Sequence, residues 1–75
     1  MPAKEPALIK FGNNVRARRE ALDLSQEQLA ERADLDRTYI SGVERGVRNL
    51  SILSVVRIAK ALKASSAELC TGIDR

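Results

Sequence analysis

The sequence predicts an all-α fold, in which five short helices pack around one small core. The first indication is composition: hydrophobic residues make up 44% of the 75 residues, but aromatic residues only 3%. Such a core is aliphatic and rich in alanine, which favours closely packed helices over a β-sandwich. The second indication is the recurrence of helix-capping residues directly before segments whose apolar residues repeat at helical spacing. These capping residues are Ser25, Asp36, Ser51 and Ser65.

The chain length allows one domain. Residues 1–5 show no apolar period, so we expect a flexible N-terminal arm there, followed by a single domain over residues 6–75. A domain of this size buries only about 60% of the surface that its unfolded chain exposes, so pairing with a second copy would help to stabilise it.

The first helix is expected to begin at Pro6, because the N–H that proline lacks would have no partner in the first turn. The apolar side chains that follow recur at spacings of three, four and seven and predict one buried stripe. This stripe consists of Leu8, Phe11, Val15 and Leu22. Asp23 and Leu24 then end the helix.

A second helix is predicted by Ser25 and Gln28, which have the spacing of a capping box. Leu29 and Ala30 face inward in this helix, and the small side chain of Ala30 allows another helix to cross closely. Asp34 then occupies the turn, because aspartate adopts the left-handed conformation at modest cost.

Asp36 is the predicted N-cap of a third helix over residues 37–45, with Ile40 and Val43 facing inward. Residues 26–45 are therefore interpreted as a helix-turn-helix. The outer face of the third helix consists of Arg37, Thr38, Ser41, Gly42 and Arg45. An ordinary solvated helix would carry Glu and Lys there. Glycine in mid-helix costs about 1 kcal/mol relative to alanine, which indicates that either a groove or a neighbouring helix approaches closely.

A polar face with small residues fits the major groove of double-stranded DNA, which admits one α-helix with its N-terminal residues nearest the base edges. Arg37 and Thr38 are the first two residues of the third helix and Ser41 lies one turn later, so we expect these three to read bases. Phosphate contacts are expected from the rim of the motif, namely Gln26, Asp36, Tyr39, Arg45, Arg48 and Asn49. Packing at the domain edge is the alternative role of Tyr39.

Gly46 is expected to end the third helix with a positive φ, and Ser51 to begin the fourth. The apolar positions of the fourth helix again repeat at helical spacing and predict a buried stripe. This stripe consists of Ile52, Val55, Val56, Ala59 and Leu62, with Ile58 beside it.

A short fifth helix is predicted by the capping box of Ser65 and Glu68. The residues that follow, Leu69, Cys70 and Ile73, are more apolar than a chain end requires. We therefore expect them to form a dimer interface, and burial of Cys70 as a small hydrophobic residue is the alternative.

Composition argues against several classes of protein. The chain has no His, one Cys and a formal net charge of +3. Without His, a nucleophile–base pair or a zinc site is hard to assemble, so we expect no enzyme, no metal and no cofactor, and no small-molecule ligand is evident. The lone Cys fits a reducing cytoplasm, and no apolar run approaches the roughly 20 residues of a membrane span. Mild positive charge is compatible with DNA but does not identify it.

Residues 8–72 resemble the Cro and phage-repressor (XRE-like) type of helix-turn-helix domain, a five-helix fold that binds DNA. The resemblance is carried by the segments SQEQLA (25–30), DRTYISGVERG (36–46) and IAKAL (58–62). It implies a salt bridge between Arg19 and Glu44, whose positions tie the first helix to the third in such repressors. The sequence departs from the family at Asp34, where glycine is frequent, and at Gly42, where related repressors often carry a base-reading side chain.

Within that group, the segment LDRTYISGVERGVRNLS (35–51) is most similar to the controller proteins of restriction–modification systems. The resemblance implies a homodimer that binds palindromic operator sites upstream of its own gene, and hence an autoregulatory transcription regulator. The alternatives are an antitoxin-type or phage-type repressor, and a helical protein–protein interaction module without DNA binding. The last would present an apolar face on the third helix, whereas the sequence predicts a polar one.

Overall fold

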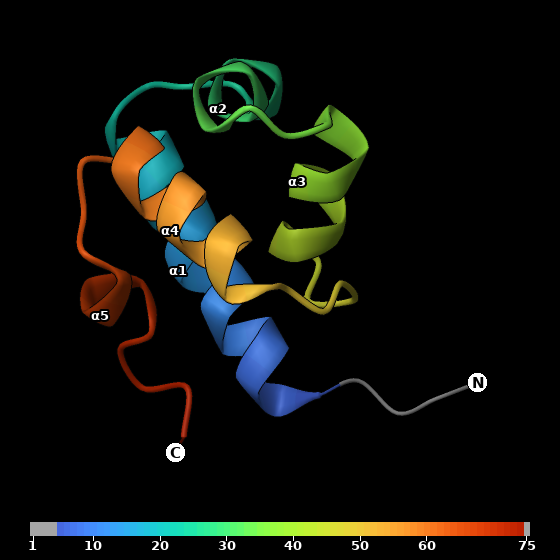
Figure 1. Cartoon of the computed structure of the whole chain (residues 1–75). Helices are drawn as coiled ribbons and strands as arrows, with labels where there is room; N and C mark the ends of the chain where they lie inside the picture. Colours follow the sequence, from blue (N-terminus) through green and yellow to red (C-terminus); the bar gives the residue numbers. More distant parts are fainter. Residues whose placement is uncertain (1–4, 75) are drawn as a thin grey trace.

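The computed structural model describes residues 5–74 and folds them into five α-helices joined by short loops (Figure 1). The helices are α1 (Pro6–Ala21), α2 (Gln26–Ala33), α3 (Arg37–Glu44), α4 (Ile52–Ala61) and α5 (Ser66–Leu69). The predicted all-α class is confirmed. Residues 1–4 of the expected N-terminal arm lie outside the described residues, and Glu5 directly precedes α1.

Local hydrogen bonds fix where the helices begin. Ser25 Oγ accepts from the N–H of Gln28 at 3.0 Å, and Gln28 Oε1 accepts from the N–H of Ser25 at 2.8 Å. Ser65 and Glu68 make the same reciprocal pair at 3.0 and 2.9 Å. Both predicted capping boxes are confirmed, and each satisfies two backbone donors that a helix start otherwise leaves without partners.

The turn between α2 and α3 depends on Asp34, which has a φ of 57° and ends α2 in the left-handed conformation, as expected. Aspartate has a Cβ, unlike glycine, so this conformation is strained. Aspartate is nevertheless among the residues that tolerate it best. Gly46 lies directly after the C-cap of α3 and has a φ of 74°, also as expected. The tight turn sets α3 at a steep angle to α2 (Figure 1).

One hydrophobic core joins all five helices, and its packing places α1 against α3 and α5, and α2 against α3 and α4. The largest fully buried side chains are Val15, Leu29, Ile40, Val43, Ile58 and Leu69.

Two sequence-based assignments to the core are wrong. Leu22 lies past the last turn of α1 and is 40% exposed, and Ile52 begins α4 and is 82% exposed. Ile58 takes the place in the core that the predicted stripe gave to Ile52.

Two helices approach each other closely at Gly12, where α1 meets the C-terminal end of α3. A Cβ at this position would overlap the carbonyl oxygen of Val43 and lie 2.9 Å from that of Glu44. The sequence alone did not reveal this contact, although a glycine inside a helix is a recognised sign of close packing.

Within residues 5–74, none of the helices has both the length and the apolar character needed to span a membrane.

Candidate nucleic-acid interface

Asp36 holds the beginning of α3. Its Oδ1 accepts hydrogen bonds from the N–H and from the Oγ1 hydroxyl of Thr38, both at 3.1 Å. The backbone hydrogen bond, followed by the hydroxyl, lowers the pKa of Asp36, so the carboxylate is ionised at neutral pH and lies at the positive end of the helix dipole. Because the Thr38 hydroxyl donates its proton to Asp36, its oxygen lone pairs remain available to a donor outside the protein.

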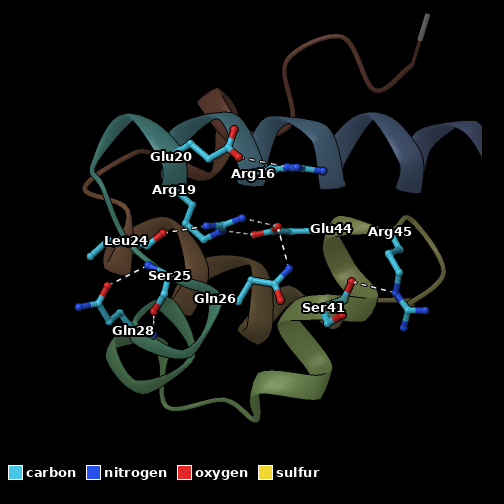
Figure 2. A network of polar contacts seen from close by, with 10 residues as sticks. All are labelled: Arg16, Arg19, Glu20, Leu24, Ser25, Gln26, Gln28, Ser41, Glu44 and Arg45. Carbon is cyan, nitrogen blue, oxygen red and sulfur yellow. Dashed lines mark hydrogen bonds and ion pairs between the residues drawn. The ribbon is translucent and has the colours of Figure 1, made fainter.

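The other end of α3 is held by the polar network in Figure 2, which centres on the carboxylate of Glu44. Arg19 on α1 donates from Nε and Nη2 to the two oxygens of Glu44 at 2.7 and 3.0 Å. Its Nη1 donates to the carbonyl oxygen of Leu24 at 2.7 Å. Gln26 on α2 adds a hydrogen bond from Nε2 to Glu44 Oε1 at 3.1 Å. Three helices therefore meet at one carboxylate.

This network contains the salt bridge that the family resemblance implied, and the pair is buried. The side chain of Arg19 is 12% exposed and that of Glu44 is 4% exposed. The hydrogen bond with Glu44 is the main reason that the pKa of Arg19 is raised, which keeps the guanidinium charged. Since Glu44 is the last residue of α3, the salt bridge and the Asp36 cap hold both ends of this helix.

The outer face of α3 is open at three of its five expected positions. Arg37, Thr38 and Arg45 are exposed, and Ser41 is half-buried. Arg45 folds back along the helix, with Nε donating to the carbonyl oxygen of Ser41 at 3.3 Å (Figure 2). The exposed N-terminal end of α3 thus presents the guanidinium of Arg37 next to the hydroxyl of Thr38.

Gly42 does not belong to the open face, so the expectation that it lines the outer surface is wrong. It is buried, and a Cβ placed on it would lie 3.4 Å from the Cβ of Arg48. The loop that follows α3 covers this glycine. The sequence predicted that a neighbouring helix or a groove comes close to Gly42. The structure shows that this loop makes the close approach instead.

The same loop carries two of the residues expected at the rim of the candidate interface, Arg48 and Asn49. The guanidinium carbon of Arg48 lies 4.6 Å from the centre of the Tyr39 ring, within the range of a cation–π interaction. Tyr39 is half-buried and packs against the core, whereas Arg48 and Asn49 are exposed. The ring thereby holds the Arg48 guanidinium against a side chain of α3.

Gln26 lies at the beginning of α2, as expected for a rim residue, but its side-chain amide is bonded to Glu44. Its side chain therefore positions α3, and the N-terminus of α2 is left as the group that can meet a phosphate. The sequence did not foresee this bond, because its two residues lie 18 positions apart.

The expected dimer residues differ in their burial. The side chain of Leu69 is fully buried, so its assignment to an interface is wrong: it has no surface to offer to a second chain. Cys70 and Ile73 are partly buried and pack against the edge of the core.

In residues 5–74, no three His, Cys, Asp or Glu side chains lie close enough together to hold a metal ion.

Helices α2 and α3 are joined by a tight turn, and α3 is capped, held at both ends and exposes Arg37 and Thr38 at its N-terminus. This arrangement is that of the helix-turn-helix class. The sequence matches the helix-turn-helix family over residues 15–69, and the chain belongs to this family.

Within the family, the chain is similar to controller proteins of restriction–modification systems, as expected from the sequence. It is 43% identical over 68 residues to the control protein C.MunI of a Mycoplasma species. The matched region covers 89% of this chain and 92% of that protein. The solved controller protein C.AhdI from Aeromonas hydrophila has a TM-score of 0.81 and 48% identity, over 83% of this chain and 94% of that one.

A second controller protein, C.Esp1396I, is known as a tetramer in complex with its natural 35 base-pair operator. Its TM-score is 0.80 and its identity 38%, over 91% of this chain and 90% of that chain.

Proposed function

We propose that the chain is a sequence-specific transcription regulator, the controller protein of a restriction–modification system, and that it acts as a homodimer on palindromic operator DNA. The observation that carries this proposal is α3, which is held at both ends and exposes Arg37 and Thr38 at its N-terminus. The operator complex of C.Esp1396I, a protein of similar fold, supports it. This function involves no catalysis and places the protein in the cytoplasm with its DNA.

The contacts to the bases follow from the donors and acceptors of α3. Arg37 is exposed and can donate two parallel hydrogen bonds to O6 and N7 of a guanine. Thr38 already donates its hydroxyl proton to Asp36, so it would accept from the amino group of a cytosine or an adenine. Ser41 would contact the next base step, one turn along the helix.

Contacts to the phosphates would position α3 without reading the sequence. Arg45, Arg48 and Asn49 are exposed around its C-terminal end. On the other side, the N-terminus of α2 near Gln26 presents backbone N–H groups, which bind phosphate readily. One recognition helix covers few base pairs, so a symmetric dimer with half-sites about 34 Å apart would provide the required specificity. Autoregulation from such a site would make the protein's own concentration the regulatory input.

The proposal is tested by binding of the protein to DNA from directly upstream of its own gene, and to random duplex, at two salt concentrations. We expect protection of a palindrome that persists at moderate salt. Arg37→Ala should cost roughly 1–3 kcal/mol of specific binding and relax the preference at one base position. Arg16→Ala removes another exposed positive charge, from α1, and should leave the preference unchanged. Equal binding to both duplexes that collapses with salt would contradict the proposal.

A further inference from the structure

Thr38 is the second residue of α3, and its side chain is exposed. A hydroxyl group has one hydrogen to donate and two lone pairs that accept. A threonine with a freely rotating hydroxyl can therefore donate to one base and accept from another, and it distinguishes bases poorly. Any group that fixes the direction of this hydrogen also decides which bases the side chain can contact.

Asp36 fixes the direction of the Thr38 hydroxyl. Its Oδ1 lies 3.1 Å from the backbone nitrogen of Thr38 and 3.1 Å from Thr38 Oγ1. The two hydrogen bonds from Thr38 lower the pKa of Asp36, and the positive charge of Arg48 adds to their effect. An ionised carboxylate has no hydrogen to donate, so the Thr38 hydroxyl is the donor in this contact. Thr38 then presents only lone pairs to a molecule outside the protein.

We propose that Asp36 is a specificity-determining residue, which holds the hydroxyl of Thr38 as an acceptor for one exocyclic amino group in the major groove. The amino groups exposed there are N6 of adenine and N4 of cytosine, whereas thymine presents O4 and guanine presents O6 and N7, which are all acceptors. On the strand that Thr38 faces, adenine and cytosine are therefore favoured over thymine and guanine. Asp36 contacts no base in this role and acts as a positioning residue. This inference rests on the proposed function.

The charge of Asp36 acts in the same direction as the orientation of the hydroxyl. Asp36 is exposed and directly precedes α3, so its carboxylate lies beside Thr38 at the end of the helix that would approach the bases. A negative charge attracts the hydrogens of an amino group and repels oxygen and nitrogen lone pairs. It also repels phosphate, so this role fits Asp36 better than the phosphate contact that the sequence suggested.

The preceding side chain has the opposite character, because the guanidinium of Arg37 carries donors only. The beginning of α3 thus offers donors at Arg37 and acceptors at Thr38, which are complementary to a guanine and to a base with an amino group, respectively.

The test uses the duplex that the protein protects upstream of its own gene, with each of the four base pairs placed at each position in turn. Thr38→Val retains the shape of the side chain without the hydroxyl, so the position where it changes the preference is the one that Thr38 contacts. At this position, the wild type should bind adenine or cytosine about tenfold more tightly than thymine or guanine, which would set an acceptor against an acceptor. The series also identifies which of the two bases supplies the amino group.

The decisive variant is Asp36→Gly, because glycine is also a favourable N-cap and leaves the Thr38 hydroxyl free to donate. The tenfold preference should fall to about twofold or less. Asp36→Asn retains an Oδ1 that accepts from Thr38 and should keep the preference. The matched control is Ser65→Gly, which makes the same change at the N-cap of α5, on the opposite side of the molecule from α3 (Figure 1), and should leave the preference as in the wild type.

A modified base tests the same contact in the unaltered protein. In a base pair, one hydrogen of the amino group bonds the partner base and the other faces the major groove. Methylation of adenine N6 or cytosine N4 replaces the second hydrogen. Binding of the wild type should weaken about tenfold on the methylated duplex, whereas Thr38→Val should bind the methylated and unmethylated duplexes equally well.

Several outcomes would overturn the inference. If Asp36→Gly weakens binding to all duplexes by the same factor, Asp36 is only a helix cap. If Asp36→Asn loses the preference as Asp36→Gly does, the charge is responsible and the orientation of the hydroxyl is not. A wild type that prefers thymine or guanine at this position, that ignores the methyl group, or whose preferences Thr38→Val leaves unchanged would also contradict it. Each of these results leaves the proposed function standing, since the protein still prefers its operator. The absence of any preferred duplex would refute the proposed function, and this inference with it.

Discussion

Replacement of Glu44 by Gln tests how much the buried network contributes to the fold. The substitution keeps the shape of the side chain but removes the negative charge, so the guanidinium of Arg19, 12% exposed, loses its counter-ion. The contacts affected are the hydrogen bonds at 2.7 and 3.0 Å from Arg19 and the one at 3.1 Å from Gln26. Leaving one charge of a buried pair without its partner costs roughly 3–5 kcal/mol.

That cost is large for a domain of this size. At roughly 0.05–0.15 kcal/mol per residue, the free energy of unfolding of the whole domain is only about 4–11 kcal/mol. With a shift of roughly 4–8 °C in Tm for each kcal/mol, we expect Glu44→Gln to lower Tm by at least about 12 °C. The measurement is thermal denaturation followed by circular dichroism.

The matched control is Glu20→Gln, which removes the same charge from an exposed pair. Arg16 Nε and Glu20 Oε2 lie 3.3 Å apart, with side chains 62% and 57% exposed, so the loss should stay within about 0.5 kcal/mol. If Glu44→Gln melts within a few degrees of this control, the role given to the buried pair is refuted. The double variant Arg19→Met with Glu44→Leu should recover most of the lost stability, because it leaves no unpaired charge in the interior.

Two further predictions concern the α1–α3 contact and the cap of α3. Gly12→Ala gains about 1 kcal/mol of helix propensity, but its Cβ would overlap the Val43 carbonyl oxygen. Overpacking against a backbone atom should outweigh this gain and leave a net loss of roughly 1–2 kcal/mol in urea denaturation; a stabilised variant would contradict the close approach. The pKa of Asp36 is lowered in the folded protein, so its charge contributes stability that is present above the unfolded pKa of about 3.9 and lost as pH falls through the folded pKa. Asp36→Asn keeps a capping side chain without the charge, so wild type should be the more stable protein at pH 7 and the two Tm values should converge near pH 2; a difference that persists in acid would show that the charge is not responsible.

The third helix, α3, illustrates how much of the structure local interactions determine. The N-cap of α3 at Asp36, the left-handed turn at Asp34 and the exposed Arg37 and Thr38 all agree with the sequence. Each depends on groups within a few residues of one another, so short-range hydrogen bonds and side-chain character were sufficient to predict it. Gly42 was the exception on this helix, because the residue that covers it belongs to the following loop.

Burial was predicted less well, because one apolar stripe is compatible with more than one rotation of a helix. In α4, the apolar residues could face the core through Ile52 or through Ile58, and both choices follow a helical period. Packing against α2 and α5 selected Ile58, which is fully buried, and left Ile52 at the surface. In the same way, Leu69 belongs to the core although its place near the chain end suggested an interface.

The sequence by itself determined the helices, their caps, the turn and the residues that α3 presents, since these depend on interactions between near neighbours in the chain. Only the tertiary structure decided which apolar side chains remain outside the core, that α1 and α3 touch at Gly12, and that Gln26 is bonded to Glu44. These features join residues far apart in the sequence. They are set by the packing of whole helices, whose relative rotations and close approaches no local pattern specifies.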